Sequence, residues 1–228
     1  MPTAIVTGAN SGIGFAFTQL LIRKGYSVTA VDVNVGDKIN SLGCATAQVD
    51  VSNPASIAAF KETYGFGSID LLLNIAGVMP PHDDDALSAI SHDTLAKVFG
   101  VNTFGPLLFT QALLPNLLLS KSPKLGVMSS RMGSIADNSS GGSYSYRASK
   151  AAVNSVFKSL AVDLKDKGVA VVIMHPGIVR TNMTAGMEGI EGAAGPEEVV
   201  EKLYEVLDSK GLEDTGRFWH RDGYELEW

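Results

Sequence analysis

A tyrosine and a lysine stand four positions apart in the segment Tyr146-Arg147-Ala148-Ser149-Lys150. Residues at this spacing share one face of a helix. A phenol with a pKa of ~10 is a poor general acid or base at neutral pH. A neighbouring ammonium favours the phenolate and lowers that pKa, so Tyr146 could exchange a proton with a substrate. An isolated match of this kind is common by chance, so the pair alone does not identify an enzyme.

A glycine-rich turn follows an apolar, strand-like run at residues 3–7. Its glycines are Gly8, Gly12 and Gly14, and a helical pattern begins directly after them. Glycines let a chain turn tightly and let backbone N–H groups approach a pyrophosphate at a helix N-terminus. The spacing is Gly-x-x-x-Gly-x-Gly, which differs from the usual Gly-x-Gly-x-x-Gly fingerprint. Such turns also occur for packing reasons, so the position between strand and helix supplies most of the evidence.

Asp32 stands at the end of the second expected strand, eighteen residues after Gly14. A carboxylate at this place can accept hydrogen bonds from both hydroxyls of an adenosine ribose. It would repel a 2′-phosphate, and no Arg or Lys stands at positions 31, 33 or 34 to offset that repulsion. The sequence therefore favours NAD over NADP as the cofactor.

Two groups of polar residues allow weaker interpretations. His175 precedes Pro176 at a strand end and is expected to be packed or hydrogen-bonded rather than catalytic. His82 and the run Asp83–Asp85 suggest a metal site, but consecutive carboxylates point in different directions. We therefore expect no metal and interpret this run as a solvated acidic loop. Because the loop follows an expected strand, it could flank the pocket mouth and disfavour anionic substrates.

Short β-branched runs alternate with longer helical stretches along the whole chain. The expected strands are 3–7, 27–33, 45–49, 71–75, 125–129 and 169–174, and the expected helices are 14–24, 52–63, 91–119, 146–167 and 196–208. Strands that are apolar on both faces and separated by helices indicate a parallel sheet covered on both sides. Right-handed crossovers then give a doubly wound α/β fold of the Rossmann type, which we expect to be a single domain spanning 1–228.

Two further segments have expected roles. Residues 182–195 form the core of a glycine- and methionine-containing stretch that we interpret as a short substrate lid. The tail 216–224 has an Asp-Gly turn after an aromatic run, and we expect it to close the sheet edge.

Composition narrows the possible partners and location. The chain has 228 residues with 45% hydrophobic residues and a formal net charge of −6, so no basic surface is present for nucleic acid. Cys44 is the single cysteine, which excludes an intrachain disulfide and a cysteine-ligated zinc site. No apolar run approaches the ~18 residues of a membrane span. The first residues have the pattern of a strand and not of a leader, so we expect a soluble, cytoplasmic protein.

Taken together, the motifs resemble a known family over nearly the whole chain. In order they are Thr7-Gly8-x-x-x-Gly12-Ile13-Gly14, Asp50-Val51, Asn74-x-Ala76-Gly77, Asn102, Ser129-Ser130, Tyr146-x-x-Ser149-Lys150 and Pro176-Gly177-x-Val179-x-Thr181. This set resembles the short-chain dehydrogenase/reductase family. The run Ser129-Ser130-x-x-Gly133-Ser134-Ile135 and the Gly-Gly-x-Tyr-x-Tyr-Arg run are similar to its small carbonyl-reductase-like branch, which includes the C-factor proteins.

The resemblance implies a role for each of four residues. Tyr146 would exchange the proton, and Ser130, as the second serine of its pair, would hold the substrate oxygen. Lys150 would bind the nicotinamide ribose and lower the pKa of Tyr146. Asn102 would offer its main-chain carbonyl to a relay water. Pro106 supports this because it has no N–H for the carbonyl four residues earlier, unless it merely starts a new helix.

The resemblance also implies a set of cofactor-binding positions. They are Gly8, Asn10, Ser11, Gly12, Ile13, Gly14, Asp32, Asp50, Val51, Asn74, Ala76, Gly77, Tyr146, Lys150, Pro176, Gly177, Val179 and Thr181. Asp50 has a second interpretation, since an Asp after a strand also caps the following turn. One position departs from the family, because Ile75 stands where a second Asn is usual. Its side-chain hydrogen bonds are lost, so backbone contacts must suffice or Asn74 must compensate.

The expected function is therefore an NAD-dependent alcohol dehydrogenase or ketone reductase acting on a small to medium-sized alcohol or ketone. A dinucleotide-binding redox sensor or signalling protein on the same fold is the alternative, although a sensor would need only the binding residues. A nucleotide-sugar epimerase or dehydratase is disfavoured, because the segment after Thr181 is short for its larger substrate domain. The apolar helix faces within 104–119 and 153–160 exceed what one sheet covers, and the resemblance makes them the faces of a homodimer or homotetramer.

Overall fold

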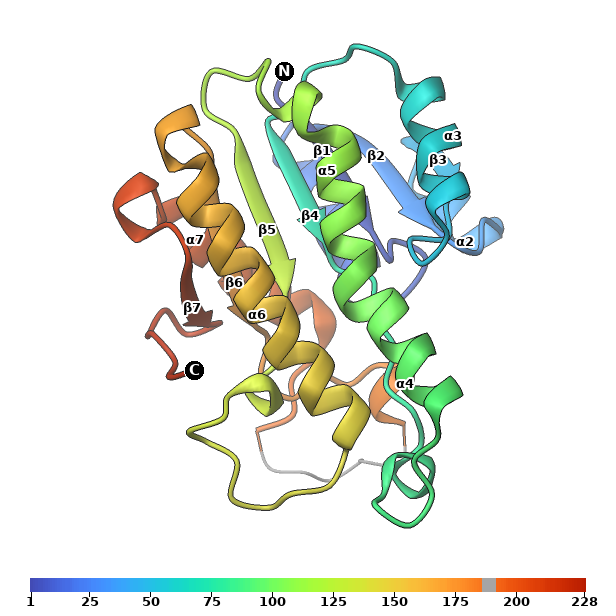
Figure 1. Ribbon diagram of the computed structural model, residues 1–228. Helices are drawn as coiled ribbons and strands as arrows, with labels where there is room; N and C mark the ends of the chain where they lie inside the picture. The colour runs from blue at the N-terminus through green and yellow to red at the C-terminus, as the bar shows by residue number, and fades with distance from the viewer. Residues whose placement is uncertain (186–191) are drawn as a thin grey trace.

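The computed structural model describes residues 1–185 and 192–228, and a parallel β-sheet runs through its centre (Figure 1). Its strands are β1 (Thr3–Thr7), β2 (Ser27–Asp32), β3 (Ala45–Gln48), β4 (Leu71–Asn74), β5 (Lys124–Met128), β6 (Ala170–His175) and β7 (Arg217–His220). They pair in the order β3-β2-β1-β4-β5-β6-β7, all parallel. This is the doubly wound fold that the alternation of strand and helix patterns predicts.

Helices cover both faces of the sheet. They are α1 (Gly12–Arg23), α2 (Asp37–Asn40), α3 (Pro54–Tyr64), α4 (His92–Phe99), α5 (Gly105–Leu117), α6 (Tyr144–Leu164) and α7 (Pro196–Ser209). Short 3-10 turns are η1 (His82–Asp85), η3 (Arg131–Gly133), η4 (Lys165–Lys167), η5 (Asn182–Thr184) and η6 (Leu212–Asp214), and η2 (Gly100–Phe104) is a π-helix. In Figure 1, α5 and α6 cross in front of the strands and α7 lies behind them.

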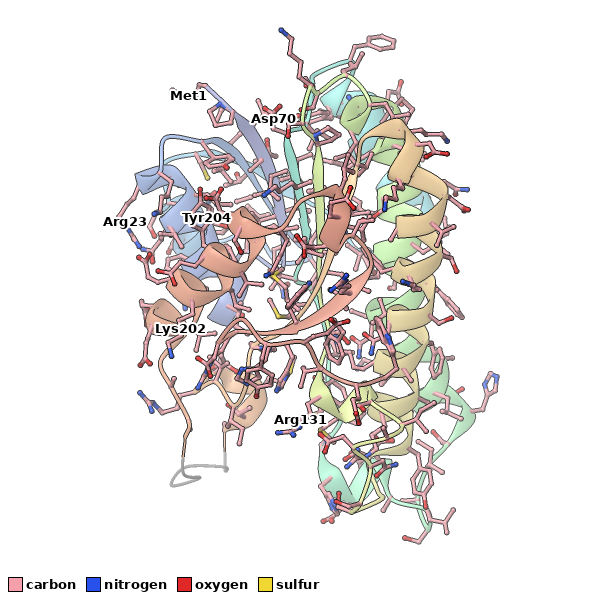
Figure 2. The ribbon with its side chains drawn as sticks, turned by 90° about the vertical axis from the view of Figure 1, so that its left-hand side faces the viewer. Met1, Arg23, Asp70, Arg131, Lys202 and Tyr204 are labelled. Atoms are coloured by element: carbon pink, nitrogen blue, oxygen red, sulfur yellow. The ribbon has the colours of Figure 1, made fainter. Side chains whose placement is uncertain are left out.

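Alternate residues of the inner strands contribute to two large hydrophobic cores, because side chains along a strand point to opposite faces. Ile5 and Leu72 pack with α3, α5 and α6, whereas Val6 and Leu73 pack with α1 and α7. Figure 2 shows Arg23 of α1 and Tyr204 of α7 on the same side of the sheet. The two helices are also joined there by an exposed ion pair between Arg23 and Glu201 at 3.3 Å.

The longest expected helix, residues 91–119, is the largest departure from the predicted elements. The structure divides it into α4, the π-helix η2 and α5. The turn widens at Gly100–Phe104, where the N–H of Gly105 donates to the carbonyl of Gly100, five residues earlier. Periodicity alone does not distinguish such a local widening from a regular helix.

The aromatic run near the C-terminus behaves as expected. β7 pairs with β6 as the edge strand, and the Asp222-Gly223 turn brings Glu225 back beside Trp219 in an antiparallel bridge. Within the described residues, no helix is long and apolar enough to cross a membrane.

Candidate active site

A pocket of about 840 Å³ opens at the carboxyl ends of the parallel strands. It lies where the strand order reverses between β1 and β4, which is where ligands bind in open α/β sheets. Its lining includes most of the predicted positions: Gly8, Ser11, Gly12, Ile13, Gly14, Asp32, Asp50, Val51, Ala76, Gly77, Ser130, Tyr146, Lys150, Pro176, Gly177, Val179 and Thr181. Asn10, Asn74 and Asn102 do not line it.

The glycine-rich turn requires glycine for two separate reasons. Gly8 and Gly12 have φ values of +70° and +52°, which favour glycine. A Cβ on Gly14 would lie 2.1 Å from the carbonyl oxygen of Gly8, and one on Gly8 would lie 2.9 Å from the Cα of Ala76. The turn therefore packs against the loop after β4. Helix α1 begins at Gly12, two residues earlier than expected.

The start of α1 has the features of an anion site. Its N-cap residue, Ser11, accepts no side-chain hydrogen bond from the first turn, so the Ser11 hydroxyl leaves the first N–H groups of the helix uncapped. These groups and the positive end of the helix dipole face the pocket that Ser11, Gly12 and Ile13 line. The buried Oδ1 of Asn10 also has no partner among the described residues. A pyrophosphate fits this cradle.

Asp32 holds the same turn from the end of β2. Its Oδ2 accepts a hydrogen bond from the Asn10 N–H, and its Oδ1 accepts one from the Asn34 N–H, both at 3.0 Å. The carboxylate also lines the pocket beside Val31 and Val33, neither of which carries charge. Asp32 therefore positions the glycine-rich turn and gives this part of the pocket a negative charge.

The contacts of Asp50 agree with its interpretation as a residue that caps the turn after β3. Its Oδ1 accepts hydrogen bonds from the N–H and the hydroxyl of Ser52, at 2.9 and 2.6 Å, and so builds the turn after β3. Asn53, rather than Asp50, caps α3 by accepting from Ala55 and Ser56. Asp50 and Val51 nevertheless line the pocket.

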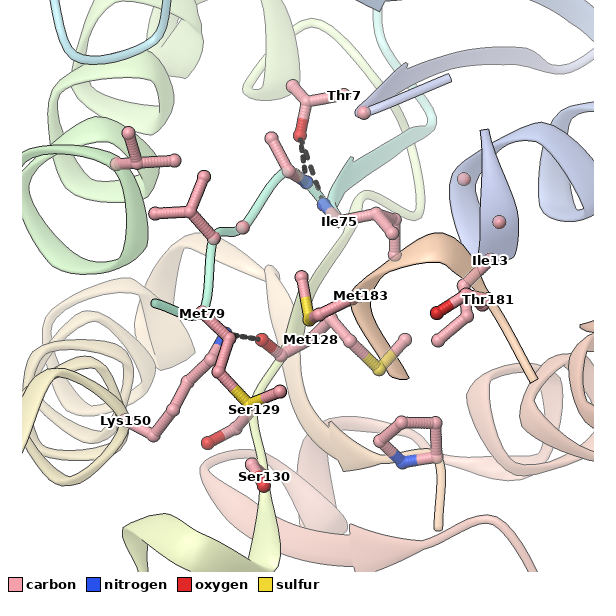
Figure 3. Close-up of a pocket in the computed structure, with 18 of the residues that line it drawn as sticks. Thr7, Ile13, Ile75, Met79, Met128, Ser129, Ser130, Lys150, Thr181 and Met183 are labelled. Carbon is pink, nitrogen blue, oxygen red and sulfur yellow. Dashed lines mark hydrogen bonds between the residues drawn. The ribbon is translucent and has the colours of Figure 1, made fainter. Parts of the chain in front are cut away.

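Tyr146 and Lys150 are buried together on the pocket wall. The Nζ of Lys150 lies 5.7 Å from the centre of the Tyr146 ring. It donates a hydrogen bond to the carbonyl of Met128 at 2.9 Å (Figure 3). Burial lowers the pKa of Lys150 to about 8. Burial raises the pKa of Tyr146, and hydrogen bonding with Ser130 acts against that rise. Ser130, Tyr146 and Lys150 therefore lie together on this wall of the pocket.

The two neighbouring serines have different surroundings. The Ser129 hydroxyl donates to Oδ1 of Asn154 at 2.5 Å, in a buried contact between β5 and α6. The Ser130 hydroxyl lies on the Tyr146 side and accepts from the N–H of Met132 at 3.2 Å. Both residues border the pocket. The Ser129 hydroxyl is therefore engaged by Asn154, whereas the Ser130 hydroxyl lies beside Tyr146.

Asn102 lies in the π-helix η2, where it is buried behind residues that line the pocket. Its Nδ2 donates to the carbonyl of Val78 at 2.9 Å and to the hydroxyl of Ser149 at 3.1 Å, and its Oδ1 accepts from the Val78 N–H at 2.8 Å. The side chain thus joins the loop after β4 to α6. A Cβ on Gly77 would lie 3.4 Å from Asn102 Oδ1 and 3.6 Å from Lys150 Nζ, so Asn102 stands close to the lysine.

Pro106 combines the two alternatives left open by the sequence. It lies in the first turn of α5, as a helix-starting proline would, but the helical backbone runs into it from η2 without a break. Because proline has no N–H, the Asn102 carbonyl lacks its ordinary α-helical partner.

Ile75 shows how the departure from the family pattern is accommodated. The Thr7 hydroxyl accepts from the N–H groups of Ile75 and Ala76 at 3.0 and 3.1 Å, so the Thr7 side chain joins β1 to the backbone of the loop after β4 (Figure 3). Asn74 does not compensate towards the pocket, because its Nδ2 donates to Thr110 of α5 at 3.2 Å.

His175 is a hydrogen-bonded residue, as expected. Its Nδ1 accepts from the N–H of Arg131 at 3.2 Å. Burial, together with the neighbouring His220, lowers the pKa of His175 to about 3, so the imidazole stays neutral. A neutral ring that is held in this way forms part of the pocket wall.

The prediction of a solvated acidic loop is wrong for one of its three aspartates. Asp83 and Asp84 are exposed, but Asp85 is buried and accepts hydrogen bonds from the N–H groups of Ser145 and Tyr146. None of the three lines the pocket, so nothing here supports an effect on anionic substrates. The sequence contained no local signal for this contact, because the partners are about sixty positions apart.

Several lining residues were not predicted at all. They are Met79, Met128, Met132, Ile178, Arg131, Asp137 and Arg147. Met183, which could equally have been a core residue, also lines the pocket, within the turn η5 at the start of the expected lid. Gly186, Met187 and Gly189 of that segment lie outside the described residues. The methionines have no motif spacing, and only the fold brings them together.

Comparison with known proteins agrees with this geometry. The short chain dehydrogenase family model matches residues 2–189. The chain belongs to the short-chain dehydrogenase/reductase family. It is therefore an oxidoreductase that acts on alcohol or carbonyl substrates with a nicotinamide dinucleotide, and its pocket contains the cradle such a cofactor needs.

Three similar proteins illustrate the range of this family. The chain is 35% identical to 1-hydroxy-2-glutathionyl-2-methyl-3-butene dehydrogenase of Rhodococcus sp. (strain AD45), with both chains covered in full. It is 36% identical to the C-signal protein of Myxococcus xanthus over 75% of this chain and 99% of that protein. NADPH-bound carbonyl reductase from chicken fatty liver superposes with a TM-score of 0.92 at 29% identity, covering 100% of this chain and 99% of the other.

Proposed function

We propose that this short-chain dehydrogenase/reductase transfers a hydride between NAD and a secondary alcohol or ketone of small to medium size. The observation that carries the proposal is the buried cluster of Ser130, Tyr146 and Lys150 on one wall of the dinucleotide-sized pocket. When bound, the nicotinamide would supply or accept the hydride. The side chains would bind and orient the substrate oxygen and move its proton.

Tyr146 acts in this proposal as the general acid in reduction and the general base in oxidation. Burial works against the phenolate, so the positive charges that favour it come from Lys150 and from the bound oxidised cofactor. Ser130 holds the substrate oxygen next to the phenol. Lys150 binds the nicotinamide ribose, and the Asn102 carbonyl holds a water that connects Lys150 to solvent.

The cofactor preference follows from Asp32. Its carboxylate would accept both hydroxyls of the adenosine ribose and would repel a 2′-phosphate, since neither Val31 nor Val33 offers a compensating charge. The remaining cofactor positions are those given by the family pattern, with the pyrophosphate at the start of α1. Asn10 and Asn74 contribute by shaping the surrounding turns.

The substrate class follows from the methionines around the cluster. Met79, Met128, Met132 and Met183 line the pocket with flexible, polarisable side chains. Such a surface adapts to apolar groups of different shapes, so we expect an apolar carbonyl compound. The Rhodococcus relative is named for a branched hydroxy-alkene that carries a glutathionyl group. The first substrates to compare are therefore apolar carbonyl compounds with and without an attached glutathionyl group, measured by their kcat/KM.

A sensor or signalling role is the alternative, and the relative named C-signal is the observation that favours it. A sensor needs the dinucleotide cradle but not the proton-transfer residues. The buried Ser130, Tyr146 and Lys150 favour the enzyme.

The deciding experiment follows NADH and NADPH oxidation across a panel of neutral ketones and diketones, with Tyr146→Phe as the control. We expect NADH-dependent turnover that disappears in the variant, while dinucleotide binding stays close to wild type. Substantial activity in Tyr146→Phe would contradict the proton-transfer role. Tight NADH binding without turnover on any compound would favour the sensor.

We further propose that the protein forms a homodimer or homotetramer through α5 and α6. Three apolar side chains on or beside these helices are exposed in the single chain: Phe104 at the end of η2 (53%), Leu119 just after α5 (58%) and Val162 of α6 (67%). Covering such apolar side chains is favourable, and symmetric helix faces are suited to it. Light scattering should give a mass of two or four chains, and a monomeric mass would contradict the proposal.

A further inference from the structure

The helix that carries Tyr146 begins without a cap from its own sequence. Ser143 precedes α6 with φ +49° and ψ +50°, a left-handed conformation that is unusual outside glycine, and its side chain caps nothing. The N–H groups in the first turn of a helix have no partner within the helix. Tyr146 lies in this first turn, so the group that satisfies these donors also determines where the catalytic helix begins.

That group is the carboxylate of Asp85. Its Oδ1 accepts from the Ser145 N–H at 2.7 Å, and its Oδ2 accepts from the Tyr146 N–H at 3.1 Å. Asp85 is only 1% exposed and belongs to the turn η1, far away in sequence. Hydrogen bonds from N–H groups to an ionised acceptor are the stronger kind, and the negative charge lies at the favourable end of the helix dipole. Two oxygens on two successive N–H groups restrain the backbone of Tyr146 itself.

A second contact joins the same two parts of the chain. Asn102 bonds both backbone groups of Val78 and the hydroxyl of Ser149, which lies three residues after Tyr146. The segment from the end of β4 to η1 is thus connected to α6 at two points, through Asn102 at Val78 and through Asp85 at the helix start. Val78 and Met79 in this segment line the pocket. The pocket wall and the catalytic helix are therefore held in one fixed relation.

We propose that Asp85 is a positioning residue for Tyr146, which sets the distance from the phenol to the substrate oxygen without touching substrate or cofactor. The inference rests on the proposed function, since it assigns Tyr146 as the proton donor. A misplacement of about 1 Å at a reacting group can cost roughly 100-fold in rate. The loss of either hydrogen bond therefore acts on kcat.

The test uses Asp85→Asn, which keeps the size of the side chain but turns one acceptor oxygen into an NH2 group that faces an N–H donor. Asp84→Asn is the matched control, because it removes the same charge from the exposed neighbouring position. Both variants are compared with wild type well below their melting temperatures. Measured are kcat and KM for a ketone with NADH, the Kd of NADH, and hydrogen exchange of the Ser145 and Tyr146 amides by NMR.

In Asp85→Asn we expect kcat to fall by about 10- to 100-fold, with the Kd of NADH unchanged. Exchange of the Ser145 and Tyr146 amides should become faster. Asp84→Asn should match wild type in all of these measurements. If Asp85→Asn fails to fold, Asp85→Glu replaces it, since both acceptors remain but the added methylene displaces the first turn. We expect a smaller fall in kcat there, again at constant Kd.

One outcome would overturn the proposal: a folded Asp85 variant in which both amides have lost protection from exchange but kcat equals that of wild type. Asp85 would then cap the helix without affecting the reaction. Unchanged protection of both amides would overturn the proposal as well, whatever the activity. If the wild-type chain turns over no compound, the proposed function fails instead. The exchange data then still decide whether Asp85 holds the Tyr146 backbone.

Discussion

The Nζ of Lys150 donates a hydrogen bond to the backbone carbonyl of Met128 at 2.9 Å, which connects the second turn of α6 to the end of β5. Ser129 and Ser130 follow Met128 directly. The buried ammonium of Lys150 thus lies between Tyr146, one helical turn earlier in α6, and the end of β5, where Ser129 and Ser130 follow. The relation explains how groups from β5 and α6 are kept in register.

The buried lysine makes the stability of the protein depend on pH in a defined direction. Burial lowers the pKa of Lys150 to about 8, from its ordinary 10.5. Between these values the unfolded chain keeps a proton that the folded chain has lost, so the free energy of unfolding gains a contribution that rises with pH. Lys150→Met lacks this contribution. Urea unfolding at pH 7 and pH 9 should show wild type gaining stability relative to the variant, and a constant difference would contradict the assignment.

The two serines predict opposite phenotypes. Ser130→Ala should lower kcat by roughly 100-fold, the size of effect seen when one donor to a reacting oxygen is removed, with little change in melting temperature. Ser129→Ala should keep kcat but lose about 1 to 3 kcal/mol of stability, because it leaves the buried Asn154 oxygen without its donor. Steady-state kinetics and thermal unfolding of both variants test this. The reverse pattern would make Ser129 the substrate-binding serine.

Asp32→Ala should reduce the preference for NAD, measured as the ratio of kcat/KM with NADH to that with NADPH. The carboxylate that repels the 2′-phosphate is removed, and so are two acceptors of backbone N–H groups, at 3.0 Å each. A fall in stability of about 1 to 2 kcal/mol should accompany the change. Asp37→Ala, in the short helix α2 that follows β2, provides the control. An unchanged cofactor ratio would mean that another residue sets the preference.

Gly133→Ala tests the close contact between η3 and the catalytic helix. A Cβ at this position would lie 2.6 Å from the backbone carbonyl carbon of Lys150. The added methyl group forces η3 away from α6, so we expect a loss of about 1 to 3 kcal/mol in stability and a lower kcat. Gly36→Ala is the matched control, since no atom lies within 4 Å of its Cβ position and its φ is −143°. Equal melting temperatures of the two variants would contradict the packing argument.

Local pattern was a good guide to the elements and to which residues border the pocket. Strand Thr3–Thr7 was predicted with its observed bounds, and most other elements end within two residues of their expected positions. The doubly wound order follows from the alternation of buried strands and helices. Ser130, Tyr146 and Lys150 were predicted because short-range spacing and motif order carry them, and all three line the pocket.

The tertiary structure decided what depends on residues far apart in the chain. The π-turn at Gly100–Phe104 and the burial of Asp85 against α6 arise from packing between the loop after β4 and two helices. A carboxylate in a run of three aspartates has the same sequence signature whether it faces water or an N–H donor sixty positions later. Local residue types determine which elements form and which chemistry they carry. The distances between those groups are set by contacts between elements, which no local pattern encodes.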